Sequence, residues 1–317
     1  MAVDLAHNPP KPSPLTSLTI SQKAPSFVRE ATSYPWPLSL ILSSESQDQW
    51  TTIENLYMSC LRTGDDESAR KLLDKLIARF GEKNERVMAY QGMWAEAHIS
   101  NEKDFVNVLK EYGEALEQDP TNIHLQKRRI ALLRSMGRTV EATQQLVNLV
   151  EFNPTDAEAW AELASLYVQQ NMYEQAIFAL EEVLLIMPNA WNMHARLAEI
   201  IYQSTNAKAE SASALDTARG YAEAMRRYCR SIELCDDYLR GYYGLKLSTK
   251  KLLEVLPNTG PTTGAPSKEK VEKLNELATT KLAEIVRIAK DKTSGYDEAE
   301  VRAARELLDR DAEKVAR

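Results

Sequence analysis

Apolar residues recur every three or four positions along most of this chain, and short polar turns separate the stretches that carry the pattern. This spacing places apolar side chains on one face of an α-helix, whereas a strand would show strict alternation. The first clear stretch begins at Trp50 and continues with Ile53, Tyr57 and Cys60, before Gly64 marks a turn. The chain is therefore expected to fold into a series of helical hairpins.

The polar turns between these helices return at a fixed interval. Pro120, Pro154 and Pro188 stand 34 residues apart, within the sequences DPTN, NPTD and MPNA. An interval kept twice indicates a repeated structural unit, and 34 residues is the length of a tetratricopeptide repeat, which forms one helical hairpin. The pattern predicts an all-α fold, a right-handed tetratricopeptide-repeat superhelix (an α-solenoid) with C-terminal capping helices.

The clearest copy of the repeat runs from Ala157 to Ala190. It follows the pattern W-x2-L-G-x2-Y, A-x3-F, P at all but two positions. Ala164 replaces the glycine and Leu180 replaces the phenylalanine, and both keep a small or apolar residue where helices must touch. The pattern positions are Trp160, Leu163, Ala164, Tyr167, Ala176, Leu180 and Pro188.

Four segments are expected along the chain. Seven of the thirteen prolines fall before residue 38, so residues 1–45 are expected to form a proline-rich, largely irregular N-terminal segment. The repeat hairpins are expected over residues 46–256. The composition of residues 257–267, PNTGPTTGAPS, is typical of a flexible loop. Residues 268–317 carry two amphipathic helical patterns, which are expected to cap the end of the solenoid.

One repeat is longer than the others. From Pro188 to Asp236, which is the equivalent stop, the chain runs 48 residues, or one repeat plus an insertion of 14. The inserted sequence is STNAKAESASALDT, at residues 204–217. Insertions in repeat proteins map to loops, so a loop at one edge of the solenoid is expected here.

Composition narrows the classes of partner. The net charge is −7 and charged residues make up 27% of the chain, which argues against a general binder of nucleic acid or of anionic membranes. The three cysteines form no CxxC pair, which fits a reducing compartment. No apolar run reaches the roughly 20 residues of a membrane span, and the N-terminus lacks the apolar stretch of a secretory signal. A cytoplasmic protein is expected, which reaches a membrane only through partner proteins.

Residue types that carry catalysis or bind metals are sparse and scattered. The four histidines lie far apart in the sequence. Two pairs could be imagined as metal ligands, namely His194 with Glu199 and Cys229 with Cys235. Neither pair has the i, i+3 or i, i+4 spacing that one helix face supplies. The phosphate-binding patterns GxxxxGK and GxGxxG do not occur. We therefore expect no catalytic residues, no bound metal and no cofactor.

The first helix of each hairpin is expected to line the inner face of the superhelix, as in tetratricopeptide arrays generally. Polar residues on these helices are candidates for a partner-binding groove, and their mixed charge suits an irregular protein segment. Helical spacing puts Lys127 and Arg134 on one face and turns Arg128 away, while a solvated basic surface is the alternative role for this cluster. The candidate groove residues are Glu54, Met58, Lys127, Arg134, Glu158, Ser165, Gln169, Glu199 and Gln203.

Beyond the generic repeat, several stretches of sequence resemble one particular family. These are Trp50 through GDDESA at 64–69, QDPTN at 118–122, KRRIALLRSMGRTVEA at 127–142, AWAELASLYVQQNMYEQAIFALEE at 159–182 and GYYGL at 241–245. With the intervening helices, the chain resembles the family of subunit 2 of the endoplasmic reticulum membrane protein complex over roughly residues 48 to 256. It departs from that family in its proline-rich start and in the long loop before the last two helices.

The resemblance implies a scaffold without a catalytic group, on the cytosolic face of the endoplasmic reticulum. A subunit of that family is expected to hold cytosolic parts of the membrane-embedded subunits, and so to be part of a hetero-oligomer. The assembled complex of that family inserts transmembrane segments, including tail anchors, into the bilayer. The expected partners of this chain are therefore the other subunits of that complex.

Two other classes of function are alternatives. A chaperone adaptor would clamp the acidic tail of a heat-shock protein with a lysine and asparagines on successive first helices. Lys127 is available for this, but Ala131 and Glu162 stand where asparagine would be wanted, and Glu162 would repel an acidic tail. A glycosyl or acyl transferase with a repeat scaffold would need a catalytic domain, and the roughly 60 residues after Leu256 are too few for one.

Overall fold

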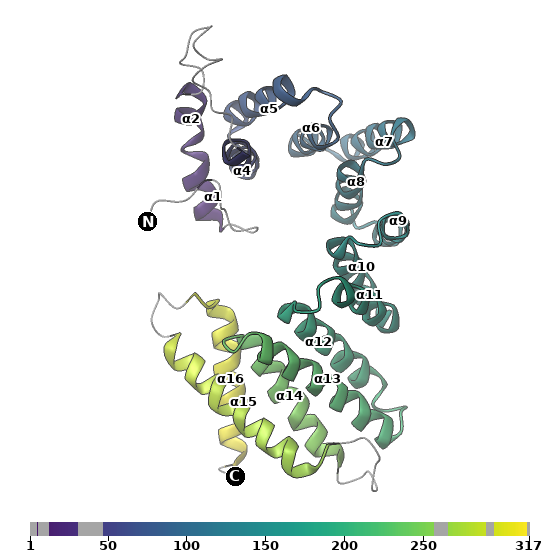
Figure 1. Cartoon of the computed structure of the whole chain (residues 1–317), viewed down its shortest axis with the longest axis vertical. Coiled ribbons are helices and arrows are strands. Elements are labelled where there is room, and N and C mark those ends of the chain that lie inside the picture. Colours follow the sequence, from purple (N-terminus) through teal and green to yellow (C-terminus); the bar gives the residue numbers. More distant parts are fainter. Residues whose placement is uncertain (1–4, 6–12, 31–46, 257–265, 290–294, 316–317) are drawn as a thin grey trace. The chain divides into compact units, whose positions relative to one another are not determined.

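The computed structural model describes Leu5 and residues 13–30, 47–256, 266–289 and 295–315, and every regular element in these ranges is a helix (Figure 1). The predicted all-α class is confirmed. Two expectations fall outside the described residues: the structure of most of the N-terminal segment, and that of the loop at 257–265.

The chain divides into two compact units, which are described separately. Unit 1 is Met1–Ala142 and unit 2 is Thr143–Arg317. The boundary falls within helix α9, Thr139–Phe152. The helices of unit 1 are α1 (Pro14–Ser21), α2 (Ala24–Glu30), α4 (Gln47–Thr63), α5 (Asp66–Phe80), α6 (Glu85–Ala97), α7 (Glu102–Gln118) and α8 (Ile123–Ser135).

The N-terminal segment contains two short helices, so the prediction of a largely irregular segment is wrong for residues 14–30. Ser13 caps α1 by accepting a hydrogen bond from the Thr16 backbone N–H at 3.1 Å. Pro14 fits the first helical position because the N–H that proline lacks has no partner there. Ile20 and Ala24 are fully buried against the core that α4 and α5 form, and this burial holds the short helices in place.

Aspartate or asparagine residues in the turns cap five of the described repeat helices. In α5, α6, α7, α8 and α10 an aspartate or asparagine side chain accepts a hydrogen bond from a backbone N–H of the first turn. Such a cap satisfies a donor that has no partner within the helix. The capping residues are Asp65, Asn84, Asn101, Asn122 and Asp156.

The 34-residue period also appears in the polar contacts. At the same position of three successive repeats, a side-chain N–H donates a hydrogen bond to the backbone carbonyl of the turn proline. The donor changes from an amide to an indole to an imidazole, while the contact is kept. For the imidazole, the contact with a carbonyl places the proton on Nε2. The pairs are Gln126 with Pro120, Trp160 with Pro154, and His194 with Pro188.

Unit 2 continues the hairpins and ends in the two helices predicted after residue 267 (Figure 1). The last two helices pack on α14 through an apolar core that includes Tyr242, Leu282 and Val301. The helices of unit 2 are α10 (Ala157–Gln169), α11 (Tyr173–Ile186), α12 (Trp191–Lys208), α13 (Ala214–Leu234), α14 (Leu239–Val255), α15 (Lys268–Ile288) and α16 (Glu298–Val315).

Most of the insertion at 204–217 lengthens two helices, so the predicted loop is confined to residues 209–213 and the prediction is wrong for the rest. Helix α12 runs on to Lys208 and α13 begins at Ala214. Alanine, lysine and glutamate in the inserted sequence favour helix. The added turns also pack together, because the Tyr221 hydroxyl donates to Asn206 Oδ1 at 2.7 Å and the Tyr221 ring lies 5.6 Å from that of Tyr202.

Two glycines allow helices to approach closely. A Cβ at Gly92 in α6 would lie 2.2 Å from the hydroxyl oxygen of Tyr112 in α7. A Cβ at Gly244 in α14 would lie 2.0 Å from the ring of Tyr228 in α13. The absence of a side chain at each glycine makes room for a buried tyrosine, which then joins two neighbouring helices.

Candidate partner-binding surface

The first helices of unit 1 lie side by side. Arg86 of α6 pairs with Glu54 of α4, with 2.5 Å between Nη2 and Oε2. The Tyr57 hydroxyl of α4 donates to the backbone carbonyl of Tyr90 in α6 at 2.6 Å, and α6 in turn packs on α8. Helices α4, α6 and α8 therefore form one row. The predicted groove residues on this row are Glu54 and Met58 on α4 and Lys127 and Arg134 on α8.

Glu54 is engaged within the protein. Its side chain is 17% exposed, and the Arg86 guanidinium that pairs with it also donates to the Tyr90 hydroxyl at 3.0 Å. Burial, together with the Glu54 charge, raises the pKa of Tyr90 to about 12, so this hydroxyl is protonated at neutral pH. The more exposed Arg86 was not among the predicted residues. Arg86 lies in the first turn of α6, a first helix, and this position is the sequence signal that could have marked it as a candidate groove residue.

Arg128 joins two first helices, α8 and α6. Its Nε donates to Glu96 Oε1 of α6 at 3.1 Å, and the Tyr112 hydroxyl donates to the same oxygen at 2.5 Å. Burial and the Glu96 charge raise the pKa of Tyr112, which therefore stays a hydrogen-bond donor.

The other three residues on this row differ in exposure. Met58 is half-buried and packs against the core of unit 1. Lys127 is half-buried, whereas Arg134, two turns further along α8, is exposed. Both cations also interact with other residues of the chain. Arg134 is thus the candidate on this row whose charge is best exposed to a partner.

Unit 2 carries the remaining five candidates, on α10 and α12. Glu158 and Gln169 are exposed, at the two ends of α10. The hydroxyl of Ser165 donates to the Ala161 carbonyl of the same helix at 3.0 Å. Glu199 of α12 pairs with Arg196 at 2.7 Å. Gln203 Nε2 also donates to Glu199, at 3.4 Å.

The nine candidates therefore form two groups, one in each unit. Within a group, the side chains come from first helices, as predicted. Two of the carboxylates, Glu54 and Glu199, already have guanidinium partners, so they are less available than spacing alone suggested. A role in binding remains a prediction for all nine.

Burial disfavours the reactive thiolate form of two cysteines, Cys60 and Cys229. Burial raises the pKa of the Cys60 thiol to about 12, with the Asp65 carboxylate adding to the effect. Burial likewise raises the pKa of the Cys229 thiol to about 11. Both thiols are protonated at neutral pH, and a protonated thiol is neither a nucleophile nor a metal ligand.

Metal clusters and membrane spans are both absent from the part of the chain that the structure describes. No three histidine, cysteine, aspartate or glutamate side chains gather there in a way that could hold a metal ion. No helix within those ranges combines the length and the apolar character needed to cross a bilayer.

The helical hairpins, their 34-residue period and their repeated turn contacts define a tetratricopeptide-repeat protein. A solved structure supports this class. The C-terminal part of a TPR repeat-containing protein from Cytophaga hutchinsonii aligns with 92% of this chain and 98% of its own, with a TM-score of 0.51 and 12% identity. At that identity the likeness shows the fold alone.

Sequence comparison identifies the family. Residues 85–214 match the family model described as the EMC2 TPR-like repeat domain. The TPR repeat protein oca3 of Schizosaccharomyces pombe is 36% identical over 214 residues, which cover 68% of this chain and 71% of that protein. ER membrane protein complex subunit 2-B of Xenopus laevis is 27% identical over 267 residues, 84% of this chain and 82% of that protein. The chain belongs to the family of ER membrane protein complex subunit 2.

Proposed function

We propose that this chain is a non-catalytic scaffold subunit on the cytosolic face of the endoplasmic reticulum membrane protein complex. It holds cytosolic parts of the membrane-embedded subunits and so supports the insertion of transmembrane segments and tail-anchored proteins. The observation that carries the proposal is membership of the subunit 2 family over most of the chain. The repeat fold supports it, because stacked hairpins present long faces that suit extended polypeptides.

In this proposal the segments of the chain have different tasks. The hairpins of residues 46–256 provide the binding faces, and residues 268–317 cap their end. The cap is consistent with the packing of α15 and α16 on α14. Membrane contact is indirect, through partner subunits.

The binding face within unit 1 is proposed to use the cations of α8. Arg134 is exposed and Lys127 is half-buried on the same helix. A partner segment with carboxylates would pair with them at the edge of the face, where such pairs contribute more to specificity and association rate than to affinity. Several such contacts along the row would together hold an irregular segment.

The test is co-purification of the tagged full-length chain with membrane subunits from detergent-solubilised endoplasmic reticulum. The wild-type chain is expected to bring membrane-embedded subunits with it. Lys127→Glu with Arg134→Glu is expected to reduce their recovery about tenfold while leaving the helical circular dichroism signal unchanged. A matched control reverses two exposed cations of α7, Lys103→Glu with Lys110→Glu, and should recover the wild-type amount.

Two results would contradict the proposal in different ways. Recovery of only soluble cytosolic proteins by the wild-type chain would reject the scaffold role. Equal recovery by the α8 and α7 variants would remove Lys127 and Arg134 from the binding face.

A further inference from the structure

One stretch of unit 2 is uniformly acidic. From Thr143 to Ala195 the chain has no lysine or arginine, but it has seven aspartate and glutamate residues. On α11, Glu174 pairs with Lys208, and Glu181 lies 3.5 Å from Arg227. Asp156, Glu158 and Glu162 also interact with other residues of the chain. The seven carboxylates outnumber the cations that reach this stretch from Lys208 and Arg227, so α11 keeps a negative charge at Glu182.

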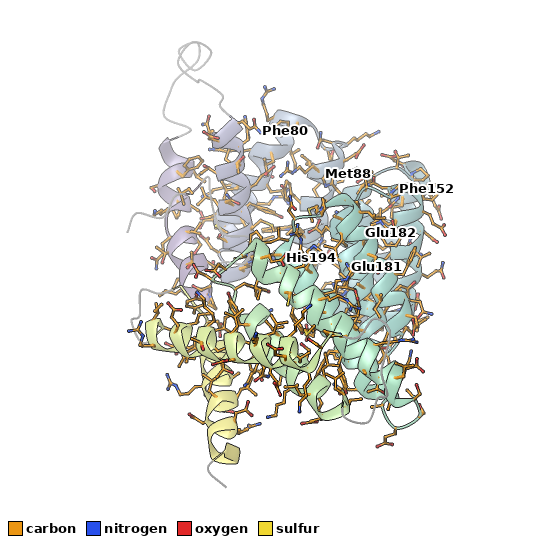
Figure 2. The ribbon with its side chains drawn as sticks, turned by 60° about the horizontal axis from the view of Figure 1, so that its bottom comes forward. Phe80, Met88, Phe152, Glu181, Glu182 and His194 are labelled. Atoms are coloured by element: carbon orange, nitrogen blue, oxygen red, sulfur yellow. The ribbon has the colours of Figure 1, made fainter. Side chains whose placement is uncertain are left out.

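Helix α11 in this stretch exposes apolar residues together with carboxylates. Leu185 follows Phe178 by seven positions, or two helical turns. Glu181 and Glu182 lie between them on the same face. We call these four residues the α11 stripe. Phe178 is 55% exposed and Leu185 is 76% exposed, whereas Leu180 on the opposite face is buried. Glu181 and Glu182 extend from adjacent positions of α11 in Figure 2.

The α11 stripe packs against α10 through Phe178, and its outer side is exposed to solvent. The Trp160 ring of α10 meets the Phe178 ring edge-on, with 6.0 Å between the ring centroids. This contact fixes the phenylalanine in place while more than half of its surface stays exposed. Glu182 forms no ion pair within the described ranges, so a cation from outside could approach it without displacing another.

Other large apolar side chains of the same stretch are exposed too. Phe152, at the end of α9, is 85% exposed and is labelled in Figure 2. Met187 and Trp191, which follow α11, are each more than one-third exposed. Exposed large apolar side chains are thus frequent in this stretch, and contiguous exposed apolar surface is typical of interaction sites.

The charge of the stretch selects among possible occupants. An anionic lipid surface would be repelled by it. A second copy of this chain in a two-fold contact would bring the same carboxylates face to face. An amphipathic helix with apolar residues at i, i+3 or i+4 and i+7 would instead cover Phe178 and Leu185, and its flanking cations would pair with Glu182.

We propose that the α11 stripe binds a basic amphipathic helix at the cytosolic end of a membrane-embedded protein. Cytosolic flanks of membrane spans are rich in lysine and arginine, which supplies the required charge. The assignment of the helix to a membrane protein rests on the proposed function, whereas the chemistry of the stripe does not. The stripe lies on a second helix, so it is distinct from the candidate groove of the first helices.

The test measures binding of a synthetic fluorescent peptide by anisotropy, using the full chain. The peptide is a model amphipathic helix with leucines on one face and lysines beside them, and its partner peptide has glutamate in place of every lysine. Leu185→Ser and Glu182→Lys are each expected to weaken binding of the basic peptide about tenfold. Leu185 is largely exposed, so its replacement should not impair folding.

Matched controls come from α15, where Glu276 and Leu277 are also exposed. Glu276→Lys and Leu277→Ser should bind the basic peptide as the wild type does. Higher salt should weaken binding of the basic peptide, since the charges involved are near the surface.

Several outcomes would overturn the assignment. These are equal binding of the two peptides, wild-type affinity in both α11 variants, or a wild-type dimer that Leu185→Ser dissociates. The co-purification experiment separates this proposal from the preceding one. If the peptides behave as expected and membrane subunits do not co-purify, then the scaffold role and the membrane source of the helix both fail. If membrane subunits co-purify and the peptides bind alike, only the stripe fails.

Discussion

At the scale of single residues, the contact between Gly92 and Tyr112 shows how tightly two helices of one hairpin are matched. A Cβ at position 92 would lie 2.2 Å from the tyrosine hydroxyl oxygen, which itself donates to Glu96. We therefore expect Gly92→Ala to lower the free energy of unfolding by about 2 kcal/mol, because the tyrosine must move out of its buried site. Thermal and urea denaturation followed by circular dichroism would measure the loss.

Gly113 provides the matched control, since it lies in α7 beside Tyr112 and a Cβ there would meet no atom within 4 Å. Gly113→Ala should stabilise the protein by about 0.5 kcal/mol, because alanine is the better helix former. Equal effects of the two substitutions on the free energy of unfolding would contradict the claim that Gly92 is needed to make room for Tyr112.

At the scale of helices, the turns of successive repeats differ in one cap. Asn122 and Asp156 cap α8 and α10, and Ala190 occupies the equivalent position before α12 without a side-chain cap. The backbone at Ala190 (φ −74°, ψ 88°) closely matches that at Asp156 (φ −81°, ψ 86°). Ala190→Asp should therefore add a cap and stabilise the chain by about 1 kcal/mol.

The reverse change, Asp156→Ala, should destabilise by a similar amount, about 1 kcal/mol. Urea unfolding of both variants, compared at constant slope, gives the two differences. A destabilising Ala190→Asp would mean that the turn before α12 does not follow the repeat geometry.

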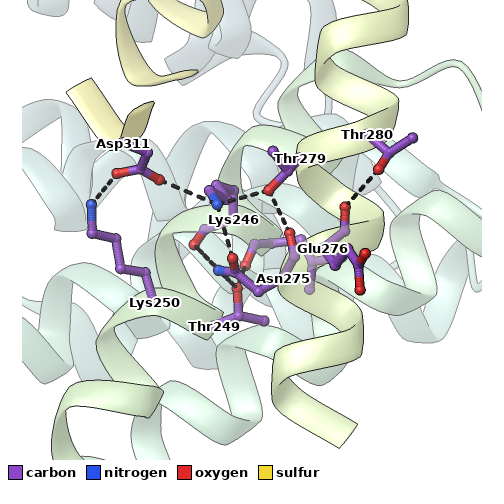
Figure 3. A network of polar contacts seen from close by, with 9 residues as sticks. Lys246, Thr249, Lys250, Asn275, Glu276, Thr279, Thr280 and Asp311 are labelled. Carbon is purple, nitrogen blue, oxygen red and sulfur yellow. Dashed lines mark hydrogen bonds and ion pairs between the residues drawn. The ribbon is translucent and has the colours of Figure 1, made fainter. Parts of the chain in front are cut away.

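The C-terminal helices are joined by a buried polar network, shown in Figure 3. Lys246 of α14 is buried, and its ammonium group donates to Asn275 Oδ1 at 2.8 Å and to Thr279 Oγ1 at 2.7 Å, both on α15. It also lies 3.2 Å from Asp311 Oδ2 of α16, whose other oxygen accepts from Lys250. One carboxylate thus attaches α16 to two lysines of α14.

This carboxylate gives the docking of α16 a pH dependence. Burial acts to raise the pKa of Asp311, but hydrogen bonds from Lys250 and Lys246 outweigh it, so the pKa is lowered. The stabilisation is therefore complete above the pKa of an unfolded aspartate, about 4, and is lost as the pH falls through the lower folded value.

Asp311→Asn should cost about 2 kcal/mol at neutral pH and much less in acid, where the wild-type carboxyl is also protonated. Urea unfolding at a series of pH values measures the difference. Asp309→Asn, at an exposed position of the same helix, should show no such pH-dependent difference. A constant gap between wild type and Asp311→Asn at all pH values would contradict the assignment.

The sequence predicted the helices best where apolar periodicity and capping residues agree. Its predictions were wrong where packing against other helices determines the local structure. Pro14 and Pro25 suggested an irregular start, but burial of Ile20 and Ala24 stabilises two short helices there. The extra length of the repeat predicts a loop at the inserted residues, whereas their helix propensity and the Tyr221 contact extend two helices and leave only residues 209–213 between them.

The candidate site was predicted less well than the fold. Helical spacing separates Lys127 from Arg128, and the structure pairs Arg128 with Glu96 of α6, while the role of Lys127 stays a prediction. The partners of Glu54 and Glu199 depend on which neighbouring side chain is long enough and near enough to reach them. Arg196 stands three residues before Glu199 on α12, so helical spacing could have suggested that pair. The Glu54–Arg86 pair depends on the packing of α4 against α6, which a single sequence does not specify.

At the scale of the whole molecule, the central claim is that the first-helix faces of this chain hold cytosolic segments of membrane-embedded subunits. The most direct measurement is photo-crosslinking in the intact complex. A photoreactive amino acid replaces Arg134 in unit 1, or Gln169 in unit 2, both of which are exposed on first helices. The control position is Lys110 on α7, a second helix of unit 1.

Adducts from Arg134 and Gln169, identified by mass spectrometry, should map to cytosol-facing segments of transmembrane subunits, and Lys110 should give few. Adducts with soluble cytosolic proteins alone, or adducts from Lys110 with none from the two first-helix positions, would contradict the account.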